Sequence, residues 1–293
     1  MTTQAHILVP VDGSGAAKRA IGYAAALADR LGARISFAHV QAPVGSIVEL
    51  RASDADGTAM MASVAADYPG AVTMPKIVVG GDIAGSICAA FPEAILVVGS
   101  ERASRGSSGK QSVAEALIRE AHDHPILVVG PASDTASFAG PIVLALDGSK
   151  VAEQAALAAL AWSRLFGPPI HLVQVMSTAA AAASVGAESS GYLQSVRAAM
   201  MVGGLEAQCF TVVDDDPVAG LLRHVAEHNC SLVVMSTHAR RGVEREAMGS
   251  VTMGVIASSP CPVCAVHPDA YLQRELAAGS TSEHAQLAPR LTP

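Results

Sequence analysis

Aromatic residues are scarce in this chain of 293 residues, where they make up 3% of the sequence. Charged residues are also few, at 15%, whereas hydrophobic residues reach 51%. Any core must therefore be built mainly from Ala, Val, Leu and Ile, and there is ample apolar material for it. The length fits about two domains of ordinary size.

Other absences limit the function. The net charge is −7, so the chain lacks the basic surface that general nucleic-acid binding requires. No apolar run reaches the roughly 18 residues of a membrane span, and the opening stretch MTTQAHILVPVDGS lacks the layout of a signal peptide. The five cysteines are scattered and odd in number, which fits a reducing compartment. We predict a soluble, cytoplasmic protein that binds neither nucleic acid nor membranes.

The chain repeats itself once. Residues 6–40 read HILVPVDGSGAAKRAIGYAAALADRLGARISFAHV, and residues 141–175 read PIVLALDGSKVAEQAALAALAWSRLFGPPIHLVQV. Asp12 and Asp147 are 135 residues apart, and later matches keep an offset between 134 and 137. This indicates a tandem duplication of a unit of roughly 130 residues. We predict a first domain over 1–130, a linker over 131–140, a second domain over 141–267 and a loosely ordered tail over 268–293.

Within each unit, short apolar runs alternate with helical patterns. Runs without clean polar alternation are typical of strands covered on both faces, and therefore of a parallel sheet in a βαβ series. Each unit is predicted to be a doubly wound α/β domain with five parallel strands. The expected strands lie near 6–11, 34–40, 76–79, 94–98 and 126–129, and near 141–146, 170–175, 209–213, 231–235 and 262–266.

Residues at the expected helix ends support this count. Ser14 and Ser149 can cap the first helix of each unit, and Gly32 and Gly167 can end it. Asp216 followed by Pro217 has the pattern of an N-cap and a first-turn proline. In a doubly wound sheet the first and fourth strands are neighbours, and ligands bind beyond their carboxyl ends. The turn at Asp12 should then face the loop from Gly99, and the turn at Asp147 the loop from Ser236.

The chain has a strand followed by V-D-G-S and a helix, a fourth strand ending in V-V-G-S, and a long loop closing in G-S-V. Together these motifs resemble those of the universal stress protein family. The resemblance implies a five-stranded, Rossmann-like fold of the adenine nucleotide alpha hydrolase type. It also implies two units packed as an internal pseudo-dimer, which we expect to join through their fifth strands. ATP-binding members carry G-x2-G-x9-G-[S/T] after the fourth strand, and the aspartate after the first strand contacts adenine.

Carried over to this chain, the resemblance implies a nucleotide site in each unit. The second unit keeps the spacing from Ser236 through Ala239 to Gly249, whereas the first has Arg102 and Gln111 at glycine positions and is one residue short. The C-terminal unit is therefore the better candidate. The implied nucleotide-binding residues are Asp12, Gly13, Val40, Gly99, Ser112 and Val113 in the first unit, and Asp147, Gly148, Val175, Ser236, Ala239, Gly249, Ser250 and Val251 in the second.

Several functions are compatible with these residues. The leading interpretation is a regulatory protein of the stress response that binds ATP, with or without Mg²⁺, forms a homodimer, and catalyses at most slow ATP hydrolysis. Asp-Gly-Ser after a strand is also ordinary turn and cap chemistry, so a scaffold of the same fold without nucleotide binding is the alternative. A third interpretation, an adenylyl-transferring ligase, is disfavoured because GSGAAK at 13–18 makes a poor phosphate loop.

The remaining polar motifs predict no metal site. Cys261 and Cys264 form a single C-x2-C without a second pair, so we expect Cys261 to lie in a loop and Cys264 in the core. A contact between Cys230 and Cys261 is conceivable. His224 and His228 are four residues apart on a helix, without the Glu of H-E-x-x-H, and are expected at the surface. Residues 214–216, three aspartates, are interpreted as an exposed loop with a helix cap.

Overall fold

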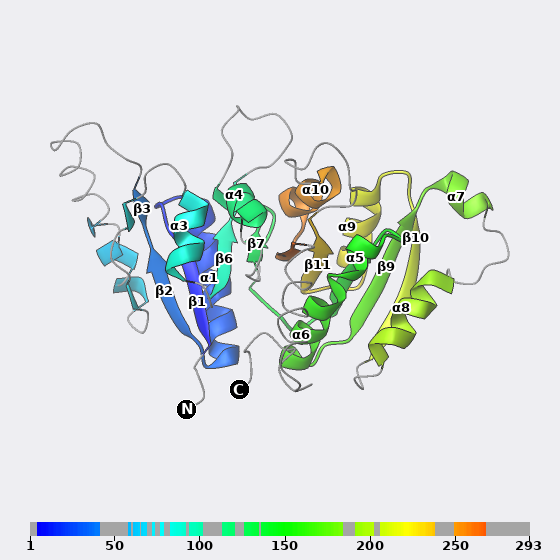
Figure 1. The fold of residues 1–293 in the computed structure, drawn as a ribbon, viewed down its shortest axis with the longest axis horizontal. Coiled ribbons are helices and arrows are strands. Elements are labelled where there is room, and N and C mark those ends of the chain that lie inside the picture. Colours follow the sequence, from blue (N-terminus) through cyan, green and yellow to red (C-terminus); the bar gives the residue numbers. More distant parts are fainter. Residues whose placement is uncertain are drawn as a thin grey trace.

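The two units lie side by side and share one ten-stranded sheet (Figure 1). The computed structural model describes residues 5–41, 58–59, 61–64, 66–68, 72–73, 77–78, 83–91, 94–101, 113–120, 126–134, 136–183, 191–201, 206–237 and 249–267. The strand order is β10-β9-β8-β11-β12-β7-β6-β1-β2-β4, and β3 pairs with β5 in a separate two-stranded sheet. No helix in these ranges is long and apolar enough to cross a membrane.

The first unit contains seven of the described strands. In its half of the large sheet the order is β4-β2-β1-β6-β7, and all neighbours are parallel. The strands are β1 (His6–Pro10), β2 (Arg34–Ala38), β3 (Val40–Gln41), β4 (Val72–Thr73), β5 (Ile77–Val78), β6 (Ile95–Gly99) and β7 (Ile126–Val129). The helices are α1 (Gly15–Leu31), α3 (Ile83–Ala90) and α4 (Val113–Glu120).

The second unit repeats this arrangement as β10-β9-β8-β11-β12, again parallel throughout. Both halves confirm the predicted doubly wound fold, with the first and fourth strands adjacent. The strands are β8 (Ile142–Leu146), β9 (Ile170–Met176), β10 (Ala207–Val213), β11 (Leu232–Ser236) and β12 (Val263–Val266). The helices are α5 (Lys150–Glu153), α6 (Ala156–Phe166), α7 (Thr178–Ala183), α8 (Gly191–Met201), α9 (Pro217–Glu227) and α10 (Ser250–Ser258).

The third strand of the first unit differs from the expectation. The sequence predicts one strand over 76–79, but the residues that join the large sheet are Val72–Thr73, while Ile77–Val78 pairs with β3. The register changes by one residue, from Phe37↔Thr73 to Val40↔Ile77. Pro75 stands between the two segments in the sequence, and proline has no N–H for a strand ladder. The predicted strand is therefore present as β5, but β4 takes its expected place beside β2 in the large sheet.

The predicted helix ends are confirmed, except that the first helix of the second unit is divided into α5 and α6 at Gln154 and Ala155. Ser14 Oγ accepts a hydrogen bond from Ala17 N at 3.2 Å, and Ser149 Oγ accepts one from Ala152 N at 3.1 Å. Gly32 and Gly167 end α1 and α6 with φ of 58° and 87°, a left-handed conformation that glycine adopts without strain. Asp216 caps α9, and Pro217 occupies its first turn. Each of these caps is closed by bonds between residues at most four positions apart.

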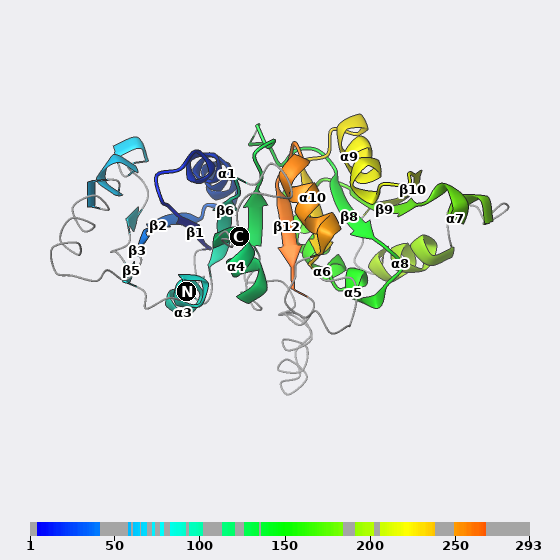
Figure 2. The same cartoon turned by 90° about the horizontal axis from the view of Figure 1, so that it is seen from above.

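The two units meet through their last strands, as the sequence predicts. β12 pairs antiparallel with β7, with Cys264 opposite Leu127, and Figure 2 shows β12 in the middle of the molecule. Next to this pair, Ser133 Oγ donates a hydrogen bond to Ser259 O at 3.1 Å, and both serines are buried. The sheet therefore runs without interruption from one unit to the other.

A cluster of aromatic rings reinforces this junction. Phe138, in the segment predicted to be a linker, is only 3% exposed. Its ring stacks on Phe166 and Trp162 of α6, at centroid distances of 5.1 and 6.2 Å, and meets Tyr23 of α1 edge-on at 6.2 Å. The linker residue thus fills a core built by helices of both units.

Candidate functional site

Both units place an exposed aspartate at the carboxyl end of the first strand. Asp12 Oδ1 accepts a hydrogen bond from Ser14 N, and Asp147 Oδ1 accepts one from Ser149 N, each at 2.9 Å. The intervening residues, Gly13 and Gly148, have φ of 80° and 86°. Glycine adopts such positive angles freely, whereas other residues are strained there. The duplicated Asp-Gly-Ser therefore forms the same tight turn twice.

In the second unit, this turn lies beside the start of α10. β8 and β11 are paired neighbours, so the turn at Asp147 and the end of β11 at Ser236 share one edge of the sheet. Gly249 N donates a hydrogen bond to Thr237 O at 3.1 Å, and Thr252 Oγ1 donates to Ser236 O at 3.4 Å. These bonds hold the N-terminus of α10 at the carboxyl end of β11.

Two polar features at this edge have no partner among the described residues. The Oγ of Ser236 is buried and neither donates nor accepts a hydrogen bond among these residues. Gly249, the N-cap of α10, provides no side-chain cap, as Ala155 provides none for α6, whereas α1, α5 and α9 begin with a side-chain cap. Free backbone N–H groups at a helix start, together with the helix dipole, favour an anion. The start of α10 therefore offers backbone donors, and no described side chain caps it.

The structure adds two residues that sequence reasoning missed. A Cβ on Gly148 would lie 3.7 Å from Gln174 Nε2, so the Gln174 amide lies against the turn. The buried hydroxyl of Tyr192, from α8, has its pKa raised to about 12 by burial and by the nearby carboxylates of Glu153 and Asp147. Both residues are far from Asp147 in sequence, so no local motif indicates them.

The equivalent edge of the first unit carries an acid. Glu101 Oε1 accepts a long hydrogen bond, 3.5 Å, from Ala16 N at the start of α1, and Arg19 Nη2 donates to Ser100 O at 3.2 Å. This carboxylate occupies the start of α1, whereas the helix that corresponds to α10 in this unit is α4. Packing explains the glycine at position 99, because a Cβ there would fall 2.1 Å from the Ala16 carbonyl oxygen.

The other predicted site residues are dispersed. Val40 lies in β3, Val113 begins α4, and Val251 lies in the first turn of α10. Val113 and Val251 are partly buried against the core. Val175 packs toward α9, since a Cβ on Gly220 would lie 2.8 Å from Val175 Cγ1. Ser112 and Ala239 fall outside the described residues. The structure thus brings together Asp147, Gly148, Ser236, Gly249 and Ser250 in the second unit.

One sequence-based expectation about the histidines is wrong. His228 is exposed as predicted, but His224 is only 3% exposed, and its Nε2 lies 3.1 Å from Nδ1 of the buried His171. The side of α9 that carries His224 faces β9, so the spacing of the two histidines along the helix did not show that His224 is buried. Burial, followed by the charge of His228, lowers the pKa of His171 to about 4, and burial has the same effect on His224.

The cysteines and aspartates agree better with expectation. Cys264 is fully buried and accepts a hydrogen bond from Trp162 Nε1 at 3.3 Å, and all five cysteines are free thiols. Asp214 pairs with Arg223 at 2.6 Å, Asp215 accepts from Thr178 N at 2.9 Å, and Asp216 caps α9. Each carboxylate of this loop thus has a structural partner.

Known proteins share this architecture. The family model of the universal stress protein family matches residues 5–130 and 139–267. A universal stress protein from Archaeoglobus fulgidus DSM 4304 superposes with a TM-score of 0.69 at 20% identity, over 90% of this chain and 98% of that one. A putative universal stress protein from Pseudomonas aeruginosa UCBPP-PA14 gives 0.59 at 14% identity, over 94% and 99%. No curated protein matches the chain.

Proposed function

Because the chain belongs to the universal stress protein family, we propose that it is a regulatory protein of the stress response that binds ATP in its C-terminal unit. The observation that carries this proposal is the start of α10. It lies at the edge where Asp147 is exposed. Within the described part of the chain, it has no side-chain cap and the buried Ser236 Oγ beside it has no hydrogen-bond partner.

The proposed binding mode follows from these groups. The phosphates would accept hydrogen bonds from the free N–H groups at the start of α10 and from the exposed Ser250 hydroxyl. The adenine would lie at the Asp147 turn, beside Gln174 and Tyr192. Ser236 Oγ would donate to a ligand oxygen and so satisfy a buried group that is otherwise costly. Mg²⁺ would accompany the phosphates from the solvent side.

ATP would act as a conformational ligand. It shifts a population only by the difference between its affinities for two states. Hydrolysis should be slow at most, because the carboxylates described at this edge are already engaged. Asp147 Oδ1 accepts a hydrogen bond from Ser149 N, and Glu153 forms a salt bridge with Lys150 at 2.8 Å. The homodimer and the cytoplasmic location remain predictions.

A calorimetric titration with ATP and Mg²⁺ tests the site. We expect about one equivalent bound by the wild type, loss of binding in Gly249→Val, and roughly 10-fold weaker binding in Ser250→Ala, which removes one hydrogen bond to a charged group. Gly249 has φ of −54° and ψ of 137°, which other residues adopt, and an added Cβ meets nothing closer than 3.4 Å. Position 249 therefore accepts a Cβ without backbone strain, and circular dichroism of the variant checks that it folds.

The first unit supplies the matched control. Asp147→Asn should weaken ATP binding, whereas Asp12→Asn changes the equivalent turn and should not. The reverse result would place the site in the first unit. If the folded wild type does not bind ATP, the second candidate function holds: a scaffold of this fold, favoured by Ser236 and Ala239 standing where the ATP-binding pattern has glycines.

A further inference from the structure

A second cluster of polar side chains lies at the other end of the C-terminal sheet. His171 is the second residue of β9, His224 lies on α9, and Cys230 follows α9 just before β11. One ligand atom from each lies within 4.8 Å of the others, and the three side chains are buried, with 4%, 3% and 7% exposed. His171 precedes His224 by 53 residues and Cys230 by 59 residues. No local spacing therefore links all three.

The separation of the imidazoles suits a metal ion. His171 Nδ1 and His224 Nε2 are 3.1 Å apart. Two nitrogens bound tetrahedrally to Zn²⁺ at ~2.0–2.1 Å are about 3.3 Å from one another. The pair is therefore close to the spacing that a shared ion requires.

The backbone holds the third group in place. Cys230 N donates a hydrogen bond to Val225 O at 3.0 Å, which fixes the turn that ends α9. Phe210 packs against both buried rings, at centroid distances of 4.5 Å from His171 and 4.6 Å from His224. The exposed His228 ring lies 4.3 Å from that of His224, so the cluster adjoins solvent on this side.

We propose that His171, His224 and Cys230 form a binding site for a divalent ion of the Zn²⁺ class. Two imidazole nitrogens and one sulfur suit Zn²⁺ or Co²⁺, whereas Mg²⁺ and Ca²⁺ prefer oxygen ligands. Three protein ligands leave the fourth tetrahedral position to water. When the ion binds, the Cys230 thiol releases its proton to solvent and the thiolate sulfur forms the bond to the metal.

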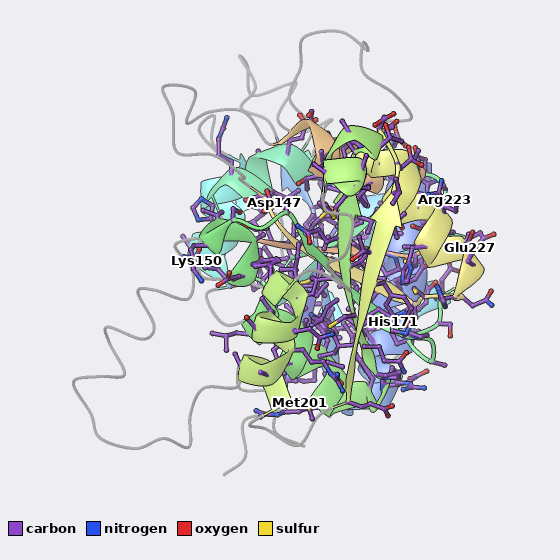
Figure 3. The ribbon with its side chains drawn as sticks, turned by 90° about the vertical axis from the view of Figure 1, so that its right-hand side faces the viewer. Asp147, Lys150, His171, Met201, Arg223 and Glu227 are labelled. Carbon is purple, nitrogen blue, oxygen red and sulfur yellow. The ribbon has the colours of Figure 1, made fainter. Side chains whose placement is uncertain are left out.

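This site is distinct from the proposed ATP site. His171 and Cys230 lie at the amino ends of β9 and β11, whereas Asp147 and Ser236 lie at the carboxyl ends of β8 and β11. Figure 3 shows Asp147 and His171 well apart on the second unit. Metal binding by the three residues does not depend on whether the chain binds ATP.

The test uses the full chain, freed of metal with a chelator and titrated with Co²⁺ and with Zn²⁺ against a competing indicator. We expect one equivalent bound, with a thiolate-to-cobalt charge-transfer band. Cys230→Ser should abolish this band and weaken Zn²⁺ binding by roughly 100-fold or more, since loss of an outer-shell partner alone costs 10–100-fold. His171→Gln should weaken Zn²⁺ binding by a similar factor.

Cys209→Ser is the matched control. Cys209 pairs with Leu172 on the neighbouring strand, but its Sγ donates to Leu193 O of α8, on the other face of the sheet. This variant should keep both the band and the affinity. The proposal is overturned if the wild type binds no stoichiometric metal, or if Cys230→Ser keeps the charge-transfer band.

A measurement on the wild type covers the case in which a variant does not fold. In the unsubstituted protein, Zn²⁺ should slow alkylation of Cys230 at least 10-fold, as followed by mass spectrometry, and leave the rate at Cys88 unchanged. Equal rates at Cys230 with and without Zn²⁺ would also overturn the proposal.

Discussion

Replacing Phe138 with Ala is expected to lower the free energy of unfolding by about 3–5 kcal/mol, the usual cost of removing a buried aromatic side chain. Phe138 is 3% exposed and lies between Tyr23 of the first unit and the Trp162 and Phe166 rings of the second. Aromatic pairs contribute beyond the area that they bury. The cavity would open where the two units meet, so both should lose stability.

Guanidinium denaturation, followed by circular dichroism and by the fluorescence of the single Trp, measures this effect. Phe138→Leu keeps most of the apolar volume and should cost clearly less than the Ala variant. Phe91→Ala is the control for position, because Phe91 is buried in the first unit away from the aromatic cluster. A loss below about 1 kcal/mol for Phe138→Ala would show that the segment 131–140 is only a connection.

Gly99→Ala should destabilise the chain by about 3 kcal/mol, at the upper end of overpacking costs. The added Cβ would fall 2.1 Å from the carbonyl oxygen of Ala16 and 2.9 Å from its Cα. Both are backbone atoms of α1, so a rotamer change cannot relieve the overlap. The helix would have to move away from the end of β6, and the core between them would loosen.

Gly22→Ala provides a control of opposite sign. Gly22 lies inside α1, and a Cβ there meets no atom within 4 Å. Alanine at such a helix position should stabilise by about 0.5–1 kcal/mol. Chemical denaturation of both variants gives the comparison. If Gly99→Ala is as well tolerated as Gly22→Ala, the close approach of α1 to β6 is not a feature of the folded protein.

The expected result for Gly99 bears on how the glycine motif is interpreted. At the same position the second unit has Ser236, and the first helix there is split into α5 and α6, with a turn at Gln154 and Ala155. A glycine at the end of the fourth strand is thus explained by helix packing in one unit and is absent from the other. Its presence alone is therefore weak evidence for a phosphate loop.

The amino-acid sequence by itself determined the repeat, nearly all the strands and the helix ends. These depend on local causes: apolar runs buried on both faces, serine and aspartate caps, and glycines that accept positive φ. The Asp-Gly-Ser turns also belong here, because each is closed by bonds between residues two or three positions apart. The family and its fold follow from the same short-range patterns.

Only the tertiary structure decided which distant side chains meet. It placed His224 against His171, Glu101 against the start of α1, and Phe138 between the helices of two units. It also decided that Val72–Thr73 joins the large sheet beside β2, while Ile77–Val78 pairs with β3. The spacing of hydrophobic residues in the sequence shows that a residue faces a core. Which residue it contacts there depends on how helices and strands far apart in the chain pack together.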